Sequence, residues 1–464
     1  METVSAKFAQ FMKGLSFEHI PEKVVEKCKL HIIDILGIAL ASSRFDFGRS
    51  VFQAARKLGR GSNSTAIGFA EKLPTASAAL LNGALAHSLD FDDTHMASVV
   101  HCGATVIPTA LALGEEVKAD GKSILTAMAG GYEIVTRLGI AAQGKFHDRG
   151  FHPTSICGTI SSSLVAGKLL ESAVAELVSG IGLSGTMASG LLEIEESWLK
   201  RLHPGWASHA GISAAYLAKN GFKGPQTILE GKMGLYAAHL YGDSYDRDGL
   251  TKDLGQQWET MNIGFKPYPC CHFLHAFIDC AKLLKERYPI EVEKIDRIDC
   301  LVSSRIIPII AEPRAMKCKP PTPYAAMFSI PFTVAAMLVT GKVDVETFKE
   351  EEIKNPRILA LAGKIFWEDD PETDYPKHFP GYVKVLMKDG RSFDWRERVN
   401  RGGPENPMSQ EEIQQKFYKN ARKAISKEKC GRIIEAVEKF EKLPRVTSLM
   451  GNLRVIKKKG SSPI

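Results

Sequence analysis

Residues 383–395, VKVLMKDGRSFDW, carry the clearest fold signal in the chain. Apolar side chains recur at every second position on both sides of Asp389-Gly390: Val383, Val385 and Met387 before the pair, and Phe393 and Trp395 after it. Asp-Gly between two alternating runs is typical of a β-hairpin. A second alternating run, from Ile295 to Val302, predicts another half-buried strand. The strands of this protein are therefore expected in the C-terminal half of the chain.

The residues before this β-rich part predict helices. Pro21 opens a stretch whose apolar residues follow the 3.6-residue period of a helix, and further helical stretches follow Pro74 and Pro108. Two later stretches, 155–169 and 206–220, are crowded with Ala, Gly and Ser. Because small residues let helix backbones approach closely, these two stretches indicate an interior helical bundle or a helix-rich dimer interface.

The composition changes near Lys266, and the helical pattern returns after Gly402-Gly403-Pro404, where Ser409 and Glu412 have the spacing of a capping box. A smaller α+β module is therefore inserted between two helical portions. We predict a mainly α fold with an α+β part, divided into a first helical segment (1–265), an inserted α+β domain (266–403) and a C-terminal helical segment (404–464). The cleft between two such modules is a common place for a small-molecule site.

The bulk composition indicates an ordinary globular protein. A length of 464 residues favours two domains, and the 44% hydrophobic and 24% charged residues are typical of a folded chain. The net charge of +7 is modest, and the basic run Arg454–Lys459 is interpreted as a solvated terminus, with a binding arm as the alternative. Because no basic stripe with interleaved aromatic residues is present, we expect no nucleic-acid partner.

Targeting and redox signals point to the cytoplasm. The first residues lack the apolar core of a signal peptide, and apolar windows such as 177–192 are too rich in Gly and Ser for a membrane span. The nine cysteines are scattered without a Cys-x-x-Cys pair, which indicates reduced thiols. We therefore expect a cytoplasmic protein with no membrane partner.

The segment between His87 and Gly103 concentrates reactive side chains, with three carboxylates and three imidazoles: His87, Asp90, Asp92, Asp93, His95 and His101. One interpretation is a polar helix terminus with solvated acids. A second is a divalent metal site, because Asp and His suit such ions, although no His-x-x-x-His spacing is present. A third has Asp90 orienting and charging a neighbouring imidazole for acid–base catalysis.

Three further segments offer polar side chains for an anionic ligand. His152 stands immediately before a predicted helix, where free backbone N–H groups favour anions, or it is simply an exposed loop residue. Lys200 and Arg201 lie beside Pro204-Gly205, which is expected to form a turn that opens a helix. These two cations either clamp a carboxylate or form a surface basic pair.

The last segment, Lys266-Pro-Tyr-Pro-Cys-Cys271-His272, is stiffened by its prolines, which restrict where Lys266 points. The paired cysteines are interpreted as buried residues, because Cys is more often buried than nucleophilic. No Gly-rich dinucleotide fingerprint follows a predicted strand, and the chain lacks a P-loop, a G-x-S-x-G elbow and an H-E-x-x-H motif. Hydride transfer, phosphoryl transfer and serine-hydrolase chemistry therefore lose support, and an acid–base site with cationic anchors remains.

These segments, taken in order along the chain, resemble the MmgE/PrpD family, which includes 2-methylcitrate dehydratase, cis-aconitate decarboxylase and iminodisuccinate epimerase. The matching stretches are 87–94, 151–159, 200–225 (KRLHPGWASHAGISAAYLAKNGFKGP), 266–275, 328–332 and 403–407. The resemblance implies a large helical domain made from both ends of the chain, a smaller inserted α+β lid, a homodimer, and no metal or organic cofactor.

In the decarboxylase branch, the resemblance implies an active site at Asp90, Thr94, His101, His152, Lys200 and Lys266. Two positions depart from that branch, since a tyrosine falls on Phe332 and an imidazole falls on Cys271, with His272 adjacent. The dehydratase branch has Asn where Asp92 stands and a His-Pro-Ser-Asp-Asn run in place of the residues that begin at His101. The subfamily is therefore left open between the dehydratase, decarboxylase and epimerase branches.

The reaction expected from these residues is a cofactor-independent dehydration or decarboxylation of a small di- or tricarboxylate. We predict Asp90, His101, His152 and Lys200 as catalytic residues, the two imidazoles acting as acid and base. We predict a substrate-binding set of Thr94, Lys200, Arg201, Lys266 and His272, whose cations neutralise charge that develops on a carboxylate. The alternatives are an epimerase of an iminodisuccinate-type dicarboxylate, a non-catalytic member of the family and a metal-dependent hydrolase.

Overall fold

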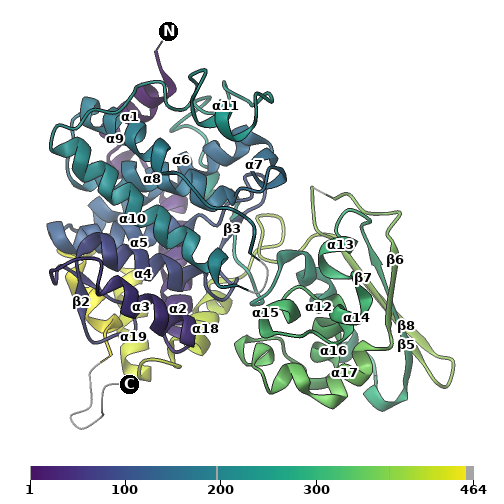
Figure 1. The fold of residues 1–464 in the computed structure, drawn as a ribbon. Helices are drawn as coiled ribbons and strands as arrows, with labels where there is room; N and C mark the ends of the chain where they lie inside the picture. Colours follow the sequence, from purple (N-terminus) through teal and green to yellow (C-terminus); the bar gives the residue numbers. More distant parts are fainter. Residues whose placement is uncertain (1, 195–196, 376, 456–464) are drawn as a thin grey trace. The chain divides into compact units, whose positions relative to one another are not determined.

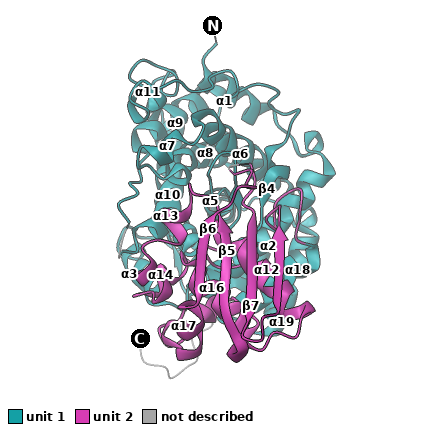
Figure 2. Ribbon diagram, turned by 90° about the vertical axis from the view of Figure 1, so that its right-hand side faces the viewer, with its two compact units in different colours: residues 1–88, 92–265, 409–464 teal, residues 89–91, 266–408 magenta. Residues whose placement is uncertain are grey.

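The computed structural model describes residues 2–194, 197–375 and 377–455 (Figure 1). Most of the basic run that was predicted to form a solvated tail, residues 456–459, lies outside the described residues. The chain forms two compact units (Figure 2). Unit 1 comprises residues 1–88, 92–265 and 409–464, and unit 2 comprises residues 89–91 and 266–408.

Unit 1 is helical, which confirms the predicted fold class for the two ends of the chain (Figure 1). Its helices are α1 (Val4–Gly14), α2 (Glu22–Ser42), α3 (Asp46–Ala55), α4 (Thr75–His87), α5 (Gly103–Val117), α6 (Gly121–Ala142), α7 (Lys145–Asp148), α8 (Pro153–Leu169), α9 (Val174–Met187), α10 (Leu199–Lys219), α11 (Leu235–His239), α18 (Gln410–Ala421), α19 (Lys427–Glu438) and α20 (Thr447–Met450). Two short antiparallel pairs accompany them: β1 (Ser64–Thr65) with β2 (Lys72–Leu73), and β3 (Thr94–His95) with β4 (Ile263–Gly264).

The interior of unit 1 is built where helices of small residues cross. Helix α10 packs against α4, α8 and α9, and α8 also packs against α5 and α6. A Cβ atom added at Gly205 of α10 would lie 2.1 Å from the carbonyl oxygen of Leu80 in α4, and one added at Gly211 would lie 2.4 Å from the Cβ of Ser162 in α8. These helices can therefore approach so closely only because glycine occupies the crossing points.

Two predicted helix starts are wrong. Pro204-Gly205 does not form a turn, because α10 already begins at Leu199 and Pro204 lies inside it. Pro108 likewise lies inside α5, which begins at Gly103. An interior proline costs a helix about 3 kcal/mol. Here α5 and α10 are each buried against several other helices, and this packing outweighs the local penalty.

The C-terminal segment returns to the helical unit. Ser409 caps α18 with the predicted capping box, since its hydroxyl accepts from the Glu412 N–H and the Glu412 carboxylate accepts from the Ser409 N–H. Helix α18 packs against α2, where the buried Lys416 and Asp34 form an ion pair of 2.7 Å. One helical body is thus assembled from both ends of the chain.

Unit 2 contains a four-stranded sheet with the order β6-β5-β7-β8, drawn in magenta in Figure 2. Its strands are β5 (Ile295–Val302), β6 (Ile365–Asp369), β7 (Gly381–Met387) and β8 (Ser392–Glu397). Strands β7 and β8 form the predicted hairpin, with Val385 opposite Phe393. Strand β5 pairs with β7 in antiparallel orientation and with β6 in parallel orientation.

The helices of unit 2 are α12 (His275–Arg287), α13 (Ile307–Ile310), α14 (Arg314–Cys318), α15 (Pro323–Ala326), α16 (Ile330–Thr340) and α17 (Pro356–Ala362). Helix α12 packs against β7, β8 and α16. The buried face of the sheet presents Ile298, Cys300, Val383 and Val385 to one apolar core. This α+β unit confirms the predicted smaller part of the fold.

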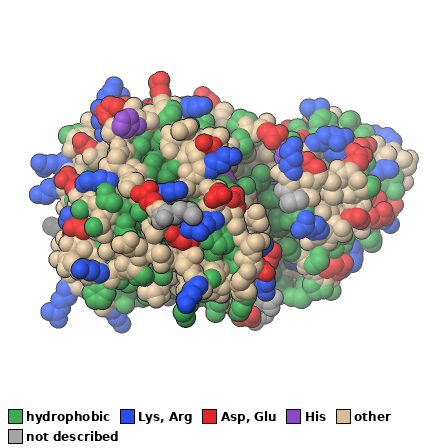
Figure 3. Space-filling model, turned by 90° about the horizontal axis from the view of Figure 1, so that it is seen from above, with side chains coloured by type: hydrophobic (Ala, Val, Ile, Leu, Met, Phe, Trp, Pro, Cys, Tyr) green, Lys and Arg blue, Asp and Glu red, His purple; other side chains and the backbone are tan. Residues whose placement is uncertain are grey.

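On the face shown in Figure 3, basic and acidic side chains are interspersed among apolar ones. Among the described residues, no helix is both long enough and apolar enough to pass through a bilayer.

Candidate active site

Three imidazoles from separate segments of unit 1 meet in its interior. His87 is the last residue of α4, His101 lies just before α5, and His152 is the N-cap residue of α8. Their ring centroids are 4.6 Å apart for His87–His101, 5.4 Å for His87–His152 and 6.1 Å for His101–His152. All three side chains are buried. The two predicted catalytic histidines are therefore brought together, and His87, which was not predicted as a site residue, joins them.

Asp92 is the carboxylate that contacts this histidine cluster. Its Oδ2 atom lies 2.8 Å from Nδ1 of His87 and 3.6 Å from Nδ1 of His101. The Nδ1 atom of His101 also lies 3.2 Å from the Thr94 hydroxyl oxygen and 3.1 Å from the Asp93 carbonyl oxygen. Because Asp92 is fully buried, its charge acts on the rings with little screening by water.

Asp92, and not Asp90, is the carboxylate that contacts the imidazoles of His87 and His101. Asp90 belongs to unit 2, where its Oδ1 atom lies 3.0 Å from Nζ of Lys266. Asp90 also has a positive φ of 49°, so the chain turns sharply between Ser88 and Asp92. The sequence could have pointed to Asp92 as a partner of His87, because Asp92 follows His87 by five residues, just beyond the end of α4.

The neighbouring Asp93 has a structural task. Its Oδ1 atom accepts a hydrogen bond of 2.7 Å from the Gly103 N–H at the start of α5, and its Oδ2 atom lies 2.7 Å from Nδ1 of the buried His31. A carboxylate at a helix N-terminus satisfies a free N–H and interacts favourably with the helix dipole. Asp93 thereby fixes the loop that carries Asp92, Thr94 and His101.

His203 of α10 is a fourth imidazole at this site, since its Nδ1 atom lies 3.0 Å from Nδ1 of His152. Burial, together with His87 and Lys200, lowers the pKa of His203 to about 4. Burial also lowers the pKa of His152 well below its usual range, and the neighbouring His87 and Lys200 act in the same direction. Both rings are therefore neutral at pH 7, and one must donate the hydrogen bond that joins them.

Lys200 and Arg201 lie in the first turn of α10 and are half-buried. Lys200 is near enough to His152 and His203 to lower the pKa of both. Arg201 donates from Nε to the Ser88 carbonyl oxygen at 2.9 Å, and its guanidinium lies 4.4 Å from the centroid of the Phe47 ring. Lys200 thus lies beside the histidine cluster, and its neighbour Arg201 is held at the end of α4.

The predicted residues of unit 2 form a group of their own. The Lys266 side chain is 2% exposed, and its Nζ atom lies 3.0 Å from both Oδ1 and the carbonyl oxygen of Asp90. His272 is buried, with Nε2 3.0 Å from Nδ2 of Asn400. Burial, with the nearby Lys266 charge, lowers the pKa of His272 to about 3, so this ring is also neutral at pH 7.

The two residues that depart from the decarboxylase branch, Phe332 and Cys271, lie in apolar surroundings. Phe332 lies at the start of α16 with no exposed surface, in the hydrophobic core of unit 2. Cys271 is 8% exposed and belongs to the same core. Burial raises the pKa of the adjacent Cys270 thiol well above its usual value, which agrees with the interpretation of these cysteines as buried residues.

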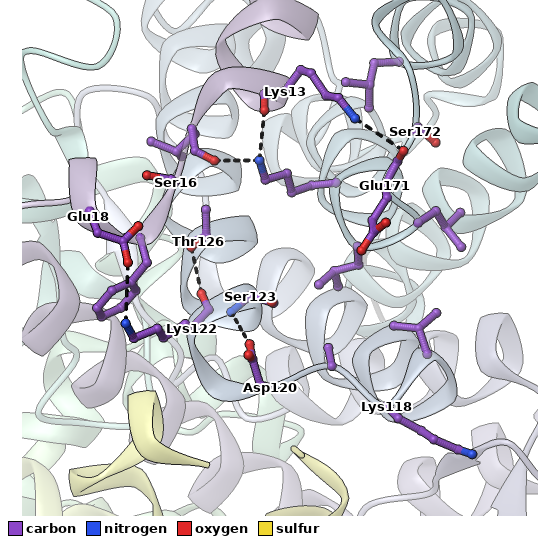
Figure 4. Close-up of a pocket in the computed structure, with 18 of the residues that line it drawn as sticks. Lys13, Ser16, Glu18, Lys118, Asp120, Lys122, Ser123, Thr126, Glu171 and Ser172 are labelled. Carbon is purple, nitrogen blue, oxygen red and sulfur yellow. Dashed lines mark hydrogen bonds and ion pairs between the residues drawn. The ribbon is translucent and has the colours of Figure 1, made fainter. Parts of the chain in front are cut away.

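A pocket of about 860 Å³ on unit 1 lies among other residues (Figure 4). None of the predicted site residues lines it. Two of its charged side chains are used in local structure: Asp120 accepts from the Ser123 N–H to cap α6, and the Lys168 ammonium donates to the carbonyl oxygens of Lys13 and Leu15. We assign the candidate site to the histidine cluster and not to this pocket.

Comparison with known proteins covers nearly the whole chain. The model of the MmgE/PrpD N-terminal domain matches residues 6–248, and that of the MmgE/PrpD C-terminal domain matches residues 268–442. Cis-aconitate decarboxylase of Homo sapiens is 28% identical, with 100% of this chain and 96% of that protein covered. The enzyme of the same name from Mus musculus is 27% identical, with 96% and 92% covered. That of Aspergillus terreus (strain NIH 2624 / FGSC A1156) is 24% identical, with 96% and 95% covered.

Proposed function

The chain belongs to the MmgE/PrpD family and is a lyase of that family, and from this premise we propose that it decarboxylates a small di- or tricarboxylate by proton transfer at carbon. The observation that carries the proposal is the buried cluster of His87, His101 and His152, with Asp92 against two of the rings. The names of the relatives make cis-aconitate the first substrate to test.

Decarboxylation requires that negative charge be stabilised while a carbon–carbon bond breaks. The bonding electron pair stays on the substrate and spreads into an adjacent unsaturated carboxylate, and carbon dioxide leaves. In our proposal the Lys200 ammonium stabilises that charge. A fixed cation in a site that excludes water contributes several kcal/mol to such a transition state.

The carbanion must then be protonated, and we propose His101 as the proton donor. Its Nδ1 atom is held by Thr94 and the Asp93 carbonyl oxygen, and the Asp92 carboxylate stabilises the imidazolium that forms between turnovers. His152 is neutral, so we propose that it hydrogen-bonds the substrate and relays protons through His203. General acid–base catalysis of this kind contributes roughly 10²–10⁴-fold in rate.

The other predicted roles remain part of the proposal. Lys266, Arg201 and His272 are proposed to bind substrate carboxylates. Asp90 was predicted to orient an imidazole, and we propose in addition that it holds Lys266 in position. The expected absence of a cofactor and the expected homodimer also remain proposals, as does a cytoplasmic location.

The proposal is tested with the purified full-length chain and four substrates: cis-aconitate, 2-methylcitrate, citrate and iminodisuccinate. Proton and carbon NMR should show loss of carbon dioxide from cis-aconitate, and His101→Gln should lower kcat by at least about 100-fold. His19→Gln, a change at an exposed histidine outside the cluster, is the control and should keep full activity. Release of water from 2-methylcitrate would assign the dehydratase branch instead. Exchange of solvent deuterium into iminodisuccinate without net product would assign the epimerase alternative.

A further inference from the structure

The histidine cluster has a second chemical capability, which is to bind a metal ion. One ring nitrogen from each of His87, His101 and His152 lies within 4.8 Å of the other two. The Nε2 atom of His87 is buried and has no hydrogen-bond partner among the residues that the structure describes. A buried nitrogen without a partner costs free energy, and a metal ion would satisfy it.

The hydrogen bonds around the cluster have the arrangement seen behind metal-binding histidines. In each ring the Nδ1 atom is engaged: by Asp92 in His87, by Thr94 and the Asp93 carbonyl oxygen in His101, and by His203 in His152. A carboxylate, carbonyl or similar group on one ring nitrogen fixes the tautomer and turns the other nitrogen toward the metal. In this cluster the second nitrogen is Nε2.

We propose that His87, His101 and His152 bind a divalent transition-metal ion of the zinc class through their Nε2 atoms. Three histidines with a fourth position open is a donor set that zinc accepts in proteins. In a tetrahedral site with bonds of about 2.0–2.1 Å, the ligand nitrogens lie about 3.3 Å from one another. The distances between the three histidine nitrogens must therefore shorten by roughly 1.5 Å at most. Such a shift is within the reach of small χ rotations, and Asp92 supplies negative charge beside two of the three ligands.

Sequence spacing conceals this site, because its ligands come from the end of α4, the loop before α5 and the start of α8. A metal site in this cluster differs from the predicted absence of a metal, which relied on ligand spacing and on the family resemblance. A bound ion would also affect catalysis, and this consequence rests on the proposed function. An ion bound to His101 and His152 occupies the nitrogens that transfer protons, so metal binding and turnover exclude each other.

Metal binding is tested without any activity measurement. The full-length chain, treated with a chelator and dialysed, is titrated with Co²⁺, and visible absorption reports its coordination. We expect one saturable ion per chain with the intense bands of a four-coordinate site, displaced by an equivalent of Zn²⁺. His87→Ala and His152→Ala should abolish the bands, and His19→Ala should retain them.

A graded variant covers the case in which the alanine variants fail to fold. Asp92→Asn leaves all three ligands in place and removes the charge behind two of them, so the dissociation constant for Co²⁺ should rise about 10–100-fold. The absence of saturable binding, or equal binding by wild type and Asp92→Asn, would overturn the proposed site.

The dependence on the proposed function is tested separately. Zn²⁺ at saturating concentration should abolish turnover of the substrate that the NMR experiment identifies, and EDTA should restore that turnover. If Zn²⁺ binds at the cluster and turnover persists, the metal site stands and the assignment of the cluster as the proton-transfer site fails. If the wild type turns over substrate but binds no ion, the proposed function stands and the metal site fails.

Discussion

Asp92 contacts two rings of the histidine cluster from a fully buried position. Asp92→Asn keeps the volume of the side chain but removes its charge, and the new amide N–H groups favour the wrong tautomer of the rings. We expect kcat to fall by at least about 100-fold, because a carboxylate of this kind both orients the imidazole and stabilises its protonated form. Steady-state kinetics on the identified substrate measure this effect.

The matched control for that variant is Asp46→Asn in the first turn of α3, where the side chain is 78% exposed. It should leave kcat within about twofold of wild type, since surface substitutions of this kind have small effects. An Asp92→Asn protein that is folded and fully active would contradict the role given to Asp92.

The ion pair between Lys266 and Asp90 carries a prediction about stability. Both side chains are almost completely buried, at 2% and 7% exposure, so removal of one partner leaves a buried charge without its counter-ion. We expect Lys266→Met and Asp90→Asn each to lower the free energy of unfolding by about 3–5 kcal/mol, and the double variant to lose less than the sum. Urea unfolding monitored by circular dichroism measures all three.

An exposed pair serves as the comparison. Lys294 and Glu291 are separated by 2.8 Å, with side chains 59% and 64% exposed, and Glu291→Gln should cost less than about 1 kcal/mol. If the losses in the single Lys266 and Asp90 variants simply add in the double variant, the two residues do not interact as described.

The crossing of α4 and α10 is the element on which the geometry of the histidine cluster depends, because His87 ends α4 and Lys200 and His203 lie on α10. A Cβ atom at Gly205 would lie 2.1 Å from the Leu80 carbonyl oxygen, so Gly205→Ala must push the helices apart. We expect a loss of about 1–3 kcal/mol in unfolding free energy together with a lower kcat. Thermal unfolding and kinetics measure the two effects.

Gly14, at the end of α1, provides the control, because a Cβ atom added there meets no atom of the described part of the chain within 4 Å. Gly14→Ala should leave stability unchanged or raise it by up to about 1 kcal/mol, since alanine restricts the unfolded chain. An unchanged melting temperature for Gly205→Ala would show that the two helices are not as close as their backbones indicate.

Acid stability is a property of the whole molecule to which the buried histidines contribute. The pKa of His272 is lowered to about 3 by burial, so below pH 6.5 the unfolded chain binds a proton that the folded chain does not. This residue therefore stabilises the fold fully above pH 6.5, and the contribution is lost as the pH falls toward 3, at roughly 1.4 kcal/mol per pH unit. The acids Asp34 and Asp279, whose pKa values burial raises to about 6, act in the opposite direction.

The contribution of His272 is isolated by comparing slopes. Between pH 6.5 and pH 5, the unfolding free energy of His272→Gln should fall by up to about 2 kcal/mol less than that of wild type. His19→Gln, at an exposed site, should follow the wild-type slope. Parallel curves for wild type and His272→Gln would contradict a neutral, buried ring at this position.

The residues themselves determine much of this protein. The alternation around Asp389-Gly390 is sufficient to specify the β7–β8 hairpin, and Ser409 with Glu412 is sufficient to cap α18, because these signals act between neighbours along the chain. The stretches that resemble the family, in their order along the chain, are also sufficient to indicate the family and its mainly helical fold.

Only the tertiary structure decided which side chains meet. Lys266 and Asp90 are 176 residues apart and pair, whereas Asp92, two residues from Asp90, reaches His87 and His101. His203, 51 residues after His152, joins the same cluster because α10 packs against α8. Pro204 lies within a helix because burial outweighed its local preference. Such outcomes depend on contacts between distant segments. The free energy of these contacts cannot be deduced from one short stretch of sequence, because it depends on both partners.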